Sequence, residues 1–406
     1  NIGDSSMARK VAIVGAGQTP CKGRWVEKTY WGLAQMAVAA AIKDAGISVK
    51  EVEGVIYGIY NDIFELSAIP EHALHGIIGM ANKPGMRVTC GGATGAYAML
   101  TAYTWVASGL YDIVMCLGVE KATDAFDFDS QTSTPEVIKT IAWSGDTFFE
   151  REIGWTASDS YAEVVLAYMD MYPGDLSDEV SAKISELLCQ QAQNNPYAQR
   201  RGEIVTADMA MKSRYIVYPF KLLETCVYTE GAGAIIFAEE EKAKAICRNM
   251  ATPPVWITGI GAANEHHVAG IQGNHKTMHR ILSDHIAARA AYQMAGITNP
   301  LKEITVIELH DAYIKQLQIT MAEMGFVPLG RADDLVKEGL MLPGGPILVN
   351  PSGGLTYAGH YVGGSNMMSC WSARRELITR GLDRALVHST GSTIAQYACI
   401  LILERG

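Results

Sequence analysis

The sequence predicts an α/β protein built from two duplicated βαβ-rich halves, each with a mixed, mostly parallel sheet. The first observation is a repeat, because a helix, a glycine stop and a buried strand at residues 40–57 return in the same order at 290–309. The second is that a strand ending in glycines precedes each copy. The third is a long segment without sheet periodicity, 121–222, which interrupts the first half. Strands and helices alternating with short turns favour helix-covered sheets.

The elements of the first half follow one another at short spacing. A strand at 11–17 ends in glycines, an amphipathic helix covering 40–47 stops at a glycine, and an apolar run at 52–57 forms the next strand. Segment 96–118 then combines a helix, a Gly-Leu turn and a further strand. This half therefore contains the start of a helix-covered sheet.

The second half repeats this arrangement. Its strand at 255–261 also ends in glycines, the helix at 290–297 also stops at a glycine, and the strand at 304–309 follows. Segment 366–391 again combines a helix, a Gly-Leu turn and a strand. Three elements that match in order favour duplication over a chance likeness of two α/β stretches.

These patterns predict the domain boundaries. Residues 1–6 are interpreted as a cloning scar. The first half covers 7–121 and 223–247, and the second half covers 248–406. Between the two parts of the first half, residues 122–222 form an inserted loop domain that we expect to cap that half and to contribute to a binding site.

Composition excludes several classes of protein. The chain has 406 residues, 49% of them hydrophobic, and a net charge of -10, which argues against a nucleic-acid partner. Its apolar runs, such as 397–403, are too short to cross a bilayer, and the start does not resemble a signal peptide. The eight cysteines are scattered without a Cys-x-x-Cys pair, so no disulfide scaffold or structural zinc site is indicated. A cytoplasmic protein is expected.

Cys90 is the first candidate for chemistry. It follows the apolar strand 86–89 and precedes a glycine-rich turn, Gly91, Gly92 and Gly95, that opens a helix. A helix N-terminus carries unpaired N–H groups and positive potential, which lower the pKa of a nearby thiol. A buried structural cysteine is the alternative, but the tight elbow favours a nucleophile.

Three histidines lie at strand ends or glycine-rich turns in the second half: His310, His360 and His388. Ligands and catalytic groups gather at the carboxyl ends of parallel strands, although a lone histidine there is more often structural. Together with Cys90 they form a Cys/His set that could deprotonate the thiol and hold an oxyanion. The adjacent histidines 266–267 are interpreted as a solvated pair rather than a metal site.

At this point the chain resembles the thiolase superfamily, in its sterol-carrier-protein-type and archaeal branch, from residue 10 to 405. Four signatures carry the resemblance: the Cys90-Gly91-Gly92 elbow, the box at 308–313, the turn at 350–355 followed by Gly359 and His360, and the His388 to Gly391 motif. The resemblance implies the thiolase fold in a layered αβαβα arrangement. The chain is also similar to the large subunit of benzoylsuccinyl-CoA thiolases.

The resemblance implies roles for these residues. Cys90 would attack the 3-keto carbon of a 3-ketoacyl-CoA, His360 would activate the thiol and bind an oxyanion, and His310 would complete that oxyanion site. A second oxyanion hole would use the Cys90 backbone N–H and a donor near Gly391, and His388 lies in the acid/base region. The chain departs from the family pattern at Ala312, where a cysteine would stand, so the proton donor stays unassigned.

The implied reaction is thiolysis of a 3-ketoacyl-CoA through an acyl-Cys90 intermediate, with an aromatic substrate such as benzoylsuccinyl-CoA giving benzoyl-CoA and succinyl-CoA. Coenzyme A is a co-substrate, and no permanently bound cofactor or metal is expected. The resemblance also implies a homodimer and a small zinc-ribbon and OB-fold partner subunit. Two alternatives stay open: a condensing acyl-CoA synthase of the same fold, and a non-catalytic acyl-CoA-binding scaffold.

Overall fold

The structure is a computed structural model of the whole chain. It describes residues 8–65, 67–122, 126–127, 132–133, 152–266, 275–391 and 395–406. Within these ranges, no helix is both long and apolar enough to span a membrane.

A ten-stranded sheet runs through the molecule and consists of two equivalent groups of five strands. The first group has the order β3-β2-β4-β9-β1 and the second β12-β11-β13-β14-β10, and they meet in a short antiparallel pairing of β1 with β10. The strands are β1 (Val11–Gln18), β2 (Gly54–Gly58), β3 (Gly85–Val88), β4 (Ile113–Glu120), β9 (Gly231–Glu239), β10 (Val255–Asn264), β11 (Val306–Glu308), β12 (Leu348–Val349), β13 (Arg384–Gly391) and β14 (Tyr397–Arg405). The same order in both groups confirms the predicted duplication.

Strand directions are also repeated. In the first group β2 pairs in parallel with both of its neighbours, and in the second group β11 does the same. The equivalent strands β9 and β14 are antiparallel to the strands on both sides. Four of the five strands therefore run in one direction, which confirms a mixed, mostly parallel sheet.

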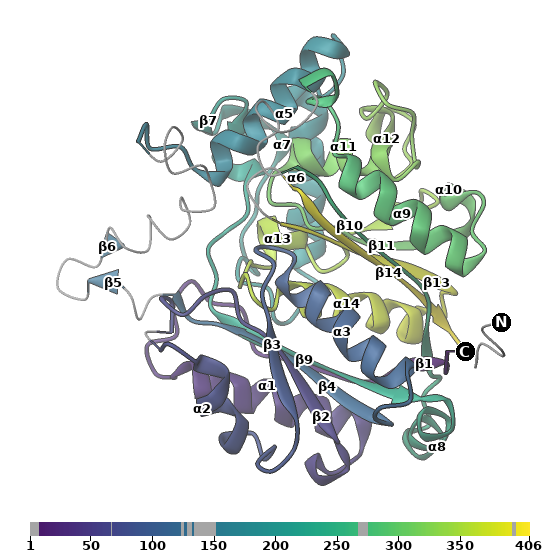
Figure 1. The fold of residues 1–406 in the computed structure, drawn as a ribbon. Helices are drawn as coiled ribbons and strands as arrows, with labels where there is room; N and C mark the ends of the chain where they lie inside the picture. Colours follow the sequence, from purple (N-terminus) through teal and green to yellow (C-terminus); the bar gives the residue numbers. More distant parts are fainter. Residues whose placement is uncertain are drawn as a thin grey trace.

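Helices cover both groups and separate them (Figure 1). The longer ones are α1 (Tyr30–Ala45), α2 (Pro70–Ile77), α3 (Thr94–Ala107), α5 (Ala157–Met171), α6 (Asp178–Ala192), α8 (Glu240–Met250), α9 (Leu282–Ala295), α11 (Ile314–Glu323) and α14 (Ser365–Arg380). Shorter helices are α7 (Ala207–Lys212), α10 (Pro300–Glu303), α12 (Asp334–Lys337) and α13 (Gly354–Tyr357), with 3-10 turns at Val49–Glu51, Leu222–Glu224 and His275–Thr277. Two small hairpins pair Phe126–Asp127 with Thr132–Ser133 and Tyr215–Val217 (β7) with Phe220–Lys221 (β8).

The apolar core confirms the layered αβαβα arrangement. Each group of five strands forms one layer of the fold. One apolar cluster joins α1 to the outer face of the first group, and another joins α9, α11 and α6 to the outer face of the second group. A third cluster lies between the two sheets and contains α3 and α14. Side chains alternate between these clusters along each strand, as the two-residue period of a strand requires. Figure 1 shows α3 and α14 between the sheets.

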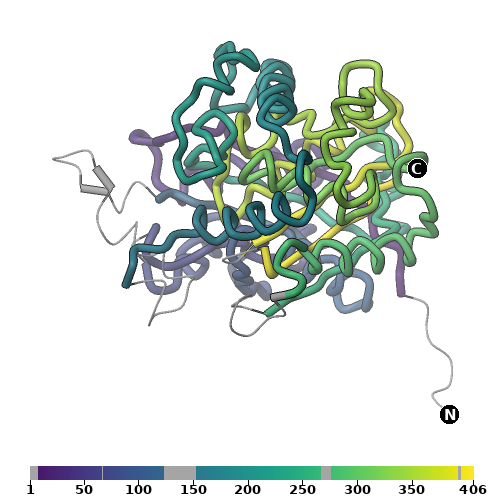
Figure 2. The backbone as a smooth tube through the Cα atoms, turned by 90° about the horizontal axis from the view of Figure 1, so that it is seen from above, coloured from purple at the N-terminus to yellow at the C-terminus, as the bar shows by residue number. Residues whose placement is uncertain are grey.

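The glycines that end β1 and β10 allow a helix to lie directly on the strand. An added Cβ at Gly17 would be 2.3 Å from the Ala41 backbone nitrogen, and one at Gly261 would be 2.0 Å from the Ala287 carbonyl oxygen. Any larger residue would push α1 or α9 away from its sheet. Figures 1 and 2 show the start of β1 and the C-terminus on the same side of the molecule.

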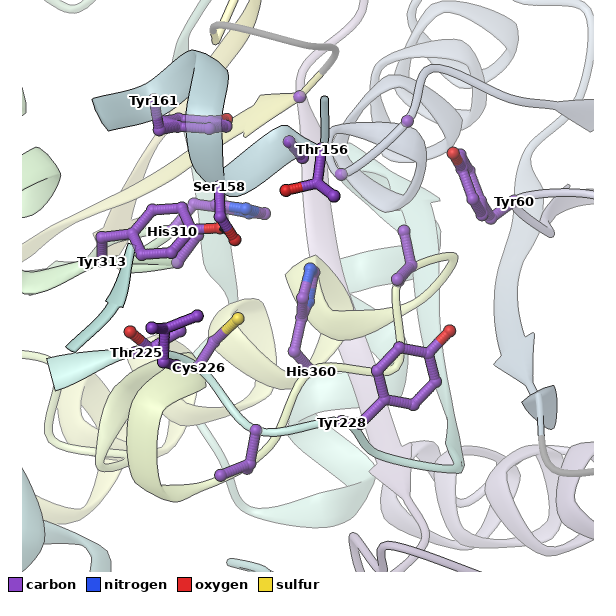
Figure 3. Close-up of a pocket in the computed structure, with 18 residues that line it drawn as sticks. Tyr60, Thr156, Ser158, Tyr161, Thr225, Cys226, Tyr228, His310, Tyr313 and His360 are labelled. Carbon is purple, nitrogen blue, oxygen red and sulfur yellow. Dashed lines mark hydrogen bonds between the residues drawn. The ribbon is translucent and has the colours of Figure 1, made fainter. Parts of the chain in front are cut away.

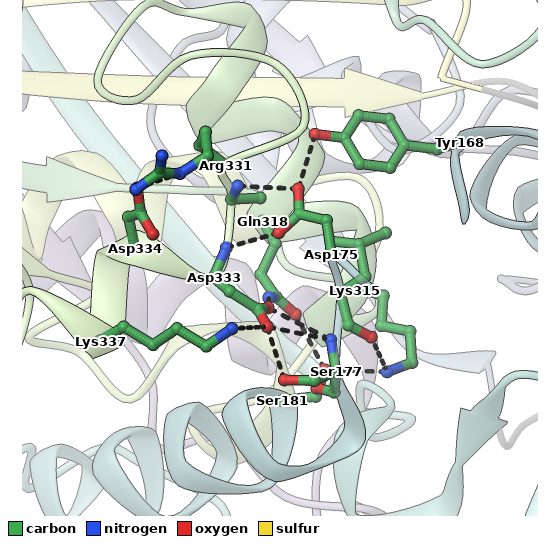
Figure 4. Close-up of polar contacts among 12 residues, drawn as sticks. Tyr168, Asp175, Ser177, Ser181, Lys315, Gln318, Arg331, Asp333, Asp334 and Lys337 are labelled. Carbon is green, nitrogen blue, oxygen red and sulfur yellow. Dashed lines mark hydrogen bonds and ion pairs between the residues drawn. The ribbon is translucent and has the colours of Figure 1, made fainter. Parts of the chain in front are cut away.

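The described part of the insertion packs largely on the second half, and it also contacts the first half, where the Cys21 N–H donates to the Tyr197 carbonyl at 2.8 Å. Helix α6 contacts α11, α12 and α13, and α5 contacts α11. A buried polar network fixes this contact, in which Asp333 accepts hydrogen bonds from Ser177 and Gln318 (Figure 4). The fully buried Lys315 also lies 2.9 Å from Asp178. Because buried charges are costly unless paired, this network specifies where the insertion sits.

Candidate active site

A cavity of about 320 Å³ opens where the two halves and the insertion meet, and its lining is mostly apolar. Its walls come from the turn before α3 at 91–92, from α5 and its cap at 156–161, from the segment 225–228 and from the end of β11 at 310–313. The remaining lining residues are Tyr60, Ile216, His360, Val362 and Gly391. Figure 3 shows these side chains converging on one space.

His310 and His360 lie side by side in this cavity. Their ring centroids are 5.0 Å apart and the planes are nearly perpendicular, at 87°. Burial lowers the pKa of His310 well below its ordinary value, with His360 and His388 adding to the shift, and burial lowers the pKa of His360 to about 4. Both rings are therefore neutral near pH 7, and each can donate from one nitrogen to a developing oxyanion.

The two sequence boxes that carry these histidines are joined by buried hydrogen bonds. Glu308 accepts from the Ser352 backbone N–H and hydroxyl at 2.9 and 2.7 Å. Asp311 accepts from the Leu355 N–H at 2.7 Å and from the Thr356 hydroxyl at 2.8 Å. Each carboxylate is thus held by the turn that leads to His360. The pairing explains why acidic residues flank His310.

His360 is oriented from two sides. Its backbone N–H donates to Thr229 Oγ1 at 2.8 Å, and its Nδ1 lies 3.0 Å from the Ser365 hydroxyl at the start of α14. The opposite edge of the ring is left for the cavity. Tyr361, which follows it, is fully buried and packs beside Gly231 and Gly364, outside the cavity.

His388 does not reach the cavity. Its Nε2 lies 2.9 Å from Asp284 Oδ1, and its Nδ1 accepts from the backbone N–H of His310 at 3.4 Å. Both its side chain and that of Asp284 are fully buried. Because both ring nitrogens are engaged, His388 is placed to position His310 and not to exchange a proton with a ligand.

Cys90 also lies outside the cavity, whose lining begins one residue later at Gly91. The turn is fixed by Thr94, whose hydroxyl accepts from the Cys90 N–H at 2.8 Å and donates to the Gly91 carbonyl at 2.6 Å. Burial raises the pKa of Cys399 to about 12, and Cys90 adds to that shift, as it does for Tyr97. Cys90 thus lies near Cys399 and Tyr97.

Two expectations for Cys90 differ from this geometry. Burial raises the pKa of its thiol, in the opposite direction to the effect expected from a helix N-terminus. The Cys90 N–H is bonded to Thr94 and is not free for an oxyanion. Gly391 lines the cavity, and its role in an oxyanion hole stays a prediction.

Gly92 is the residue of the elbow that faces His310. An added Cβ there would be 2.8 Å from His310 Cε1 and 3.2 Å from His310 Nε2. The His310 ring therefore packs directly against the Gly92 backbone, where no side chain would fit without displacing the ring. The assignment of Cys90 as the nucleophile stays a prediction.

Sequence reasoning also missed several lining residues. Cys226, Tyr60, Tyr161 and Tyr228 lie in the cavity wall. These side chains come from segments without a recognisable motif, so only their position in the fold brings them together. The insertion contributes to the cavity wall through α5 and its cap.

Among the described residues, no group of three His, Cys, Asp or Glu side chains could hold a metal ion. His266 is exposed, and His267 lies outside the described residues. The interpretation of 266–267 as a solvated pair is therefore neither supported nor contradicted.

The duplicated five-layer architecture with a cavity between its halves defines the class of thiolase-fold proteins. Comparison with family profiles agrees: residues 11–162 match "Thiolase, N-terminal domain" and residues 265–405 match "Thiolase C-terminal domain-like". An acetyl-CoA acetyltransferase of Methanocaldococcus jannaschii is 31% identical, over 88% of this chain and 87% of its own. The chain belongs to the thiolase family, and it is an acyltransferase.

Other relatives cover similar lengths. An acetyl-CoA acetyltransferase of Methanothermobacter thermautotrophicus is 29% identical over 95% of this chain and 97% of its own. The benzoylsuccinyl-CoA thiolase subunit BbsB of Thauera aromatica is 26% identical over 88% and 86%. Among solved structures, an "Ltp2-ChsH2(DUF35) aldolase" has a TM-score of 0.79 at 22% identity, covering 98% of each chain, which supports the fold alone.

Proposed function

We propose that the protein transfers an acyl group from a 3-ketoacyl-CoA to coenzyme A in the cavity of His310 and His360. The observation that carries the proposal is the perpendicular pair of neutral imidazoles, 5.0 Å apart, at the end of a mostly apolar cavity. Neutral donors in a site shielded from water stabilise an oxyanion well, because they need no reorganisation when charge develops. The acetyl-CoA acetyltransferase relatives support this reaction class.

An aromatic acyl group is the finer part of the proposal. Four tyrosines line the cavity, and aromatic rings favour offset or edge-on contact with another ring. The similarity to a benzoylsuccinyl-CoA thiolase subunit points the same way. Substrates to compare are aliphatic and aromatic 3-ketoacyl-CoA esters, with benzoylsuccinyl-CoA among them. A clear preference of kcat/KM for aliphatic esters would contradict the aromatic assignment.

An acyl-Cys90 intermediate requires the turn at 89–92 to reorganise so that the sulfur enters the cavity. Gly91, with a φ of 56°, and Gly92 give this turn more freedom than other residues would. The test is to incubate the protein with substrate in the absence of CoA and to weigh the intact chain. An adduct that is present in wild type and in C247A, whose cysteine lies in α8, but absent in C90A would support the intermediate.

Carbon–carbon cleavage without an acyl-enzyme is a second candidate, and the lining of the cavity favours it, because that lining contains His310 and His360 but not Cys90. The two imidazoles could bind the oxygen of a 3-hydroxyacyl-CoA and support aldol cleavage to a carbonyl product and a shorter acyl-CoA. The aldolase named above shares the fold. Release of an aldehyde or ketone without added CoA, with full activity in C90A, would favour this reaction over acyl transfer.

Assembly belongs to the same proposal. We expect a homodimer, and a small zinc-ribbon and OB-fold subunit that helps to accept CoA, in which case any zinc belongs to that subunit. Purification from the native source, followed by mass determination of the intact complex, tests both points. A monomer that has full activity without another protein would contradict them.

A further inference from the structure

We propose that the thiol of Cys226 is the proton donor and acceptor for the carbon–carbon bond step in the cavity. The inference rests on the proposed function, because it assigns a residue to that reaction. Cys226 is the cysteine that the described cavity lining contains. It comes from a segment that the sequence patterns did not single out.

The position of Cys226 is fixed by the backbone of the His310 segment. Its N–H donates to the Ala312 carbonyl at 2.9 Å, and the preceding Thr225 is bridged to Tyr313. Ala312 has a small side chain and lines the same cavity. The space beside position 312 is therefore open to the Cys226 sulfur, and Figure 3 shows the sulfur turned toward the side where His360 lies.

Neighbouring hydroxyls are already engaged. The Tyr313 hydroxyl lies 2.7 Å from the Ser158 hydroxyl, and the Thr225 hydroxyl donates to the Lys221 carbonyl at 2.9 Å. Cys226 has a free thiol. Burial raises the pKa of this thiol to about 12, with Asp311 adding to the shift, so that it is protonated at neutral pH.

A second observation points to a ligand in the same place. His310 is 3% exposed, its ring lines the cavity, and its Nδ1 has no hydrogen-bond partner among the described residues. A buried nitrogen without a partner costs free energy unless a ligand or water satisfies it. The cavity beside Cys226 is thus a place where a polar ligand group is expected.

The chemistry requires such a donor. When the C2–C3 bond of a 3-ketoacyl-CoA breaks, the electron pair passes to C2 of the departing thioester, which then takes a proton. Cys226 supplies that proton from its sulfur, and the resulting thiolate regains one from the incoming CoA thiol, which attacks as a thiolate. In condensation the same proton moves in the opposite direction, so no oxidant or other reactant is needed.

The experiment compares wild type, C226A, C226S and the control C247A. In each we would measure kcat and KM with the best 3-ketoacyl-CoA ester, and deuterium uptake at C2 of the thioester product in heavy water. We expect kcat of C226A to fall by about 10²- to 10⁴-fold with KM within about threefold, the usual range for loss of an acid/base group. C226S should retain more activity than C226A, and deuterium uptake should fall in parallel with kcat.

Retention of kcat and of deuterium uptake in C226A, both within about threefold of wild type, would overturn the inference. If wild type cleaves no 3-ketoacyl-CoA, the proposed function fails instead, and deuterium exchange at C2 of an acyl-CoA still tests Cys226. If C226A does not fold, the conservative variant C226S gives an independent answer. The inference expects kcat and deuterium uptake of C226S to fall together, and wild-type values of both in C226S would contradict it.

Discussion

Substitution of Gly92 by alanine tests whether the elbow before α3 closes the cavity at His310. The added Cβ would lie 2.8 Å from His310 Cε1 and 2.8 Å from the Thr390 carbonyl oxygen. Neither neighbour is the end of a flexible side chain, since one is a buried ring and the other is backbone. Overpacking of this kind costs about 1–3 kcal/mol of the free energy of unfolding.

The effect on activity should be larger than the effect on stability. To accept the methyl group, the His310 ring has to move by a few tenths of an ångström or more, and misplacement of a reacting group by about 1 Å costs up to about 10²-fold in rate. We therefore expect kcat to fall by about 10- to 100-fold, while the melting temperature falls by only a few degrees.

The assay pairs thermal or urea unfolding with steady-state kinetics on the best acyl-CoA substrate. The matched control is G76A, in α2, where an added Cβ has nothing within 4 Å. Alanine there should stabilise the helix by about 0.5–1 kcal/mol without changing kcat. If G92A keeps wild-type stability and activity, then Gly92 does not contact His310 and the described cavity is wrong at this point.

Three further predictions concern the histidines. H360A should lower kcat/KM by about 10²- to 10³-fold, the usual effect of losing one oxyanion donor. An unchanged kcat/KM in steady-state kinetics would show that His360 takes no part in the reaction. Because the pKa of His360 is about 4, below its unfolded value of about 6.5, the unfolded state takes up the proton first. The contribution of His360 to the free energy of unfolding is thus present above about pH 6.5 and is lost as the pH falls to about 4. Urea unfolding at several pH values measures this loss, and a free energy of unfolding that does not change with pH would contradict it. D284A should lower the free energy of unfolding by about 2–3 kcal/mol, because His388 loses its hydrogen-bond partner. Since His388 in turn contacts the His310 backbone, kcat of D284A should fall more than KM changes. A wild-type kcat in D284A would exclude this support of His310.

Much of the fold could be predicted from the chain alone. Apolar periodicity marked the strands and helices, and glycine stops marked helix ends such as Gly46 and Gly296, where φ is 64° and 69°. Repetition of these local signals predicted the duplication. The packing of the insertion could not be predicted, because its place depends on a buried polar network with α11 and the 330–334 turn that no local pattern shows.

The sequence by itself determined the two-half α/β plan, and its strand ends and glycine-rich turns led to His310, His360 and Gly391, which the structure places in the cavity wall. Only the tertiary structure decided which way each side chain points. It left Cys90 out of the described cavity lining, joined the nitrogens of His388 to the His310 backbone and to Asp284, and brought Cys226 into the cavity from another segment. The physical reason is that consecutive residues of a tight turn point their side chains in different directions. The hydrogen bonds that fix these directions join residues that are distant in the sequence.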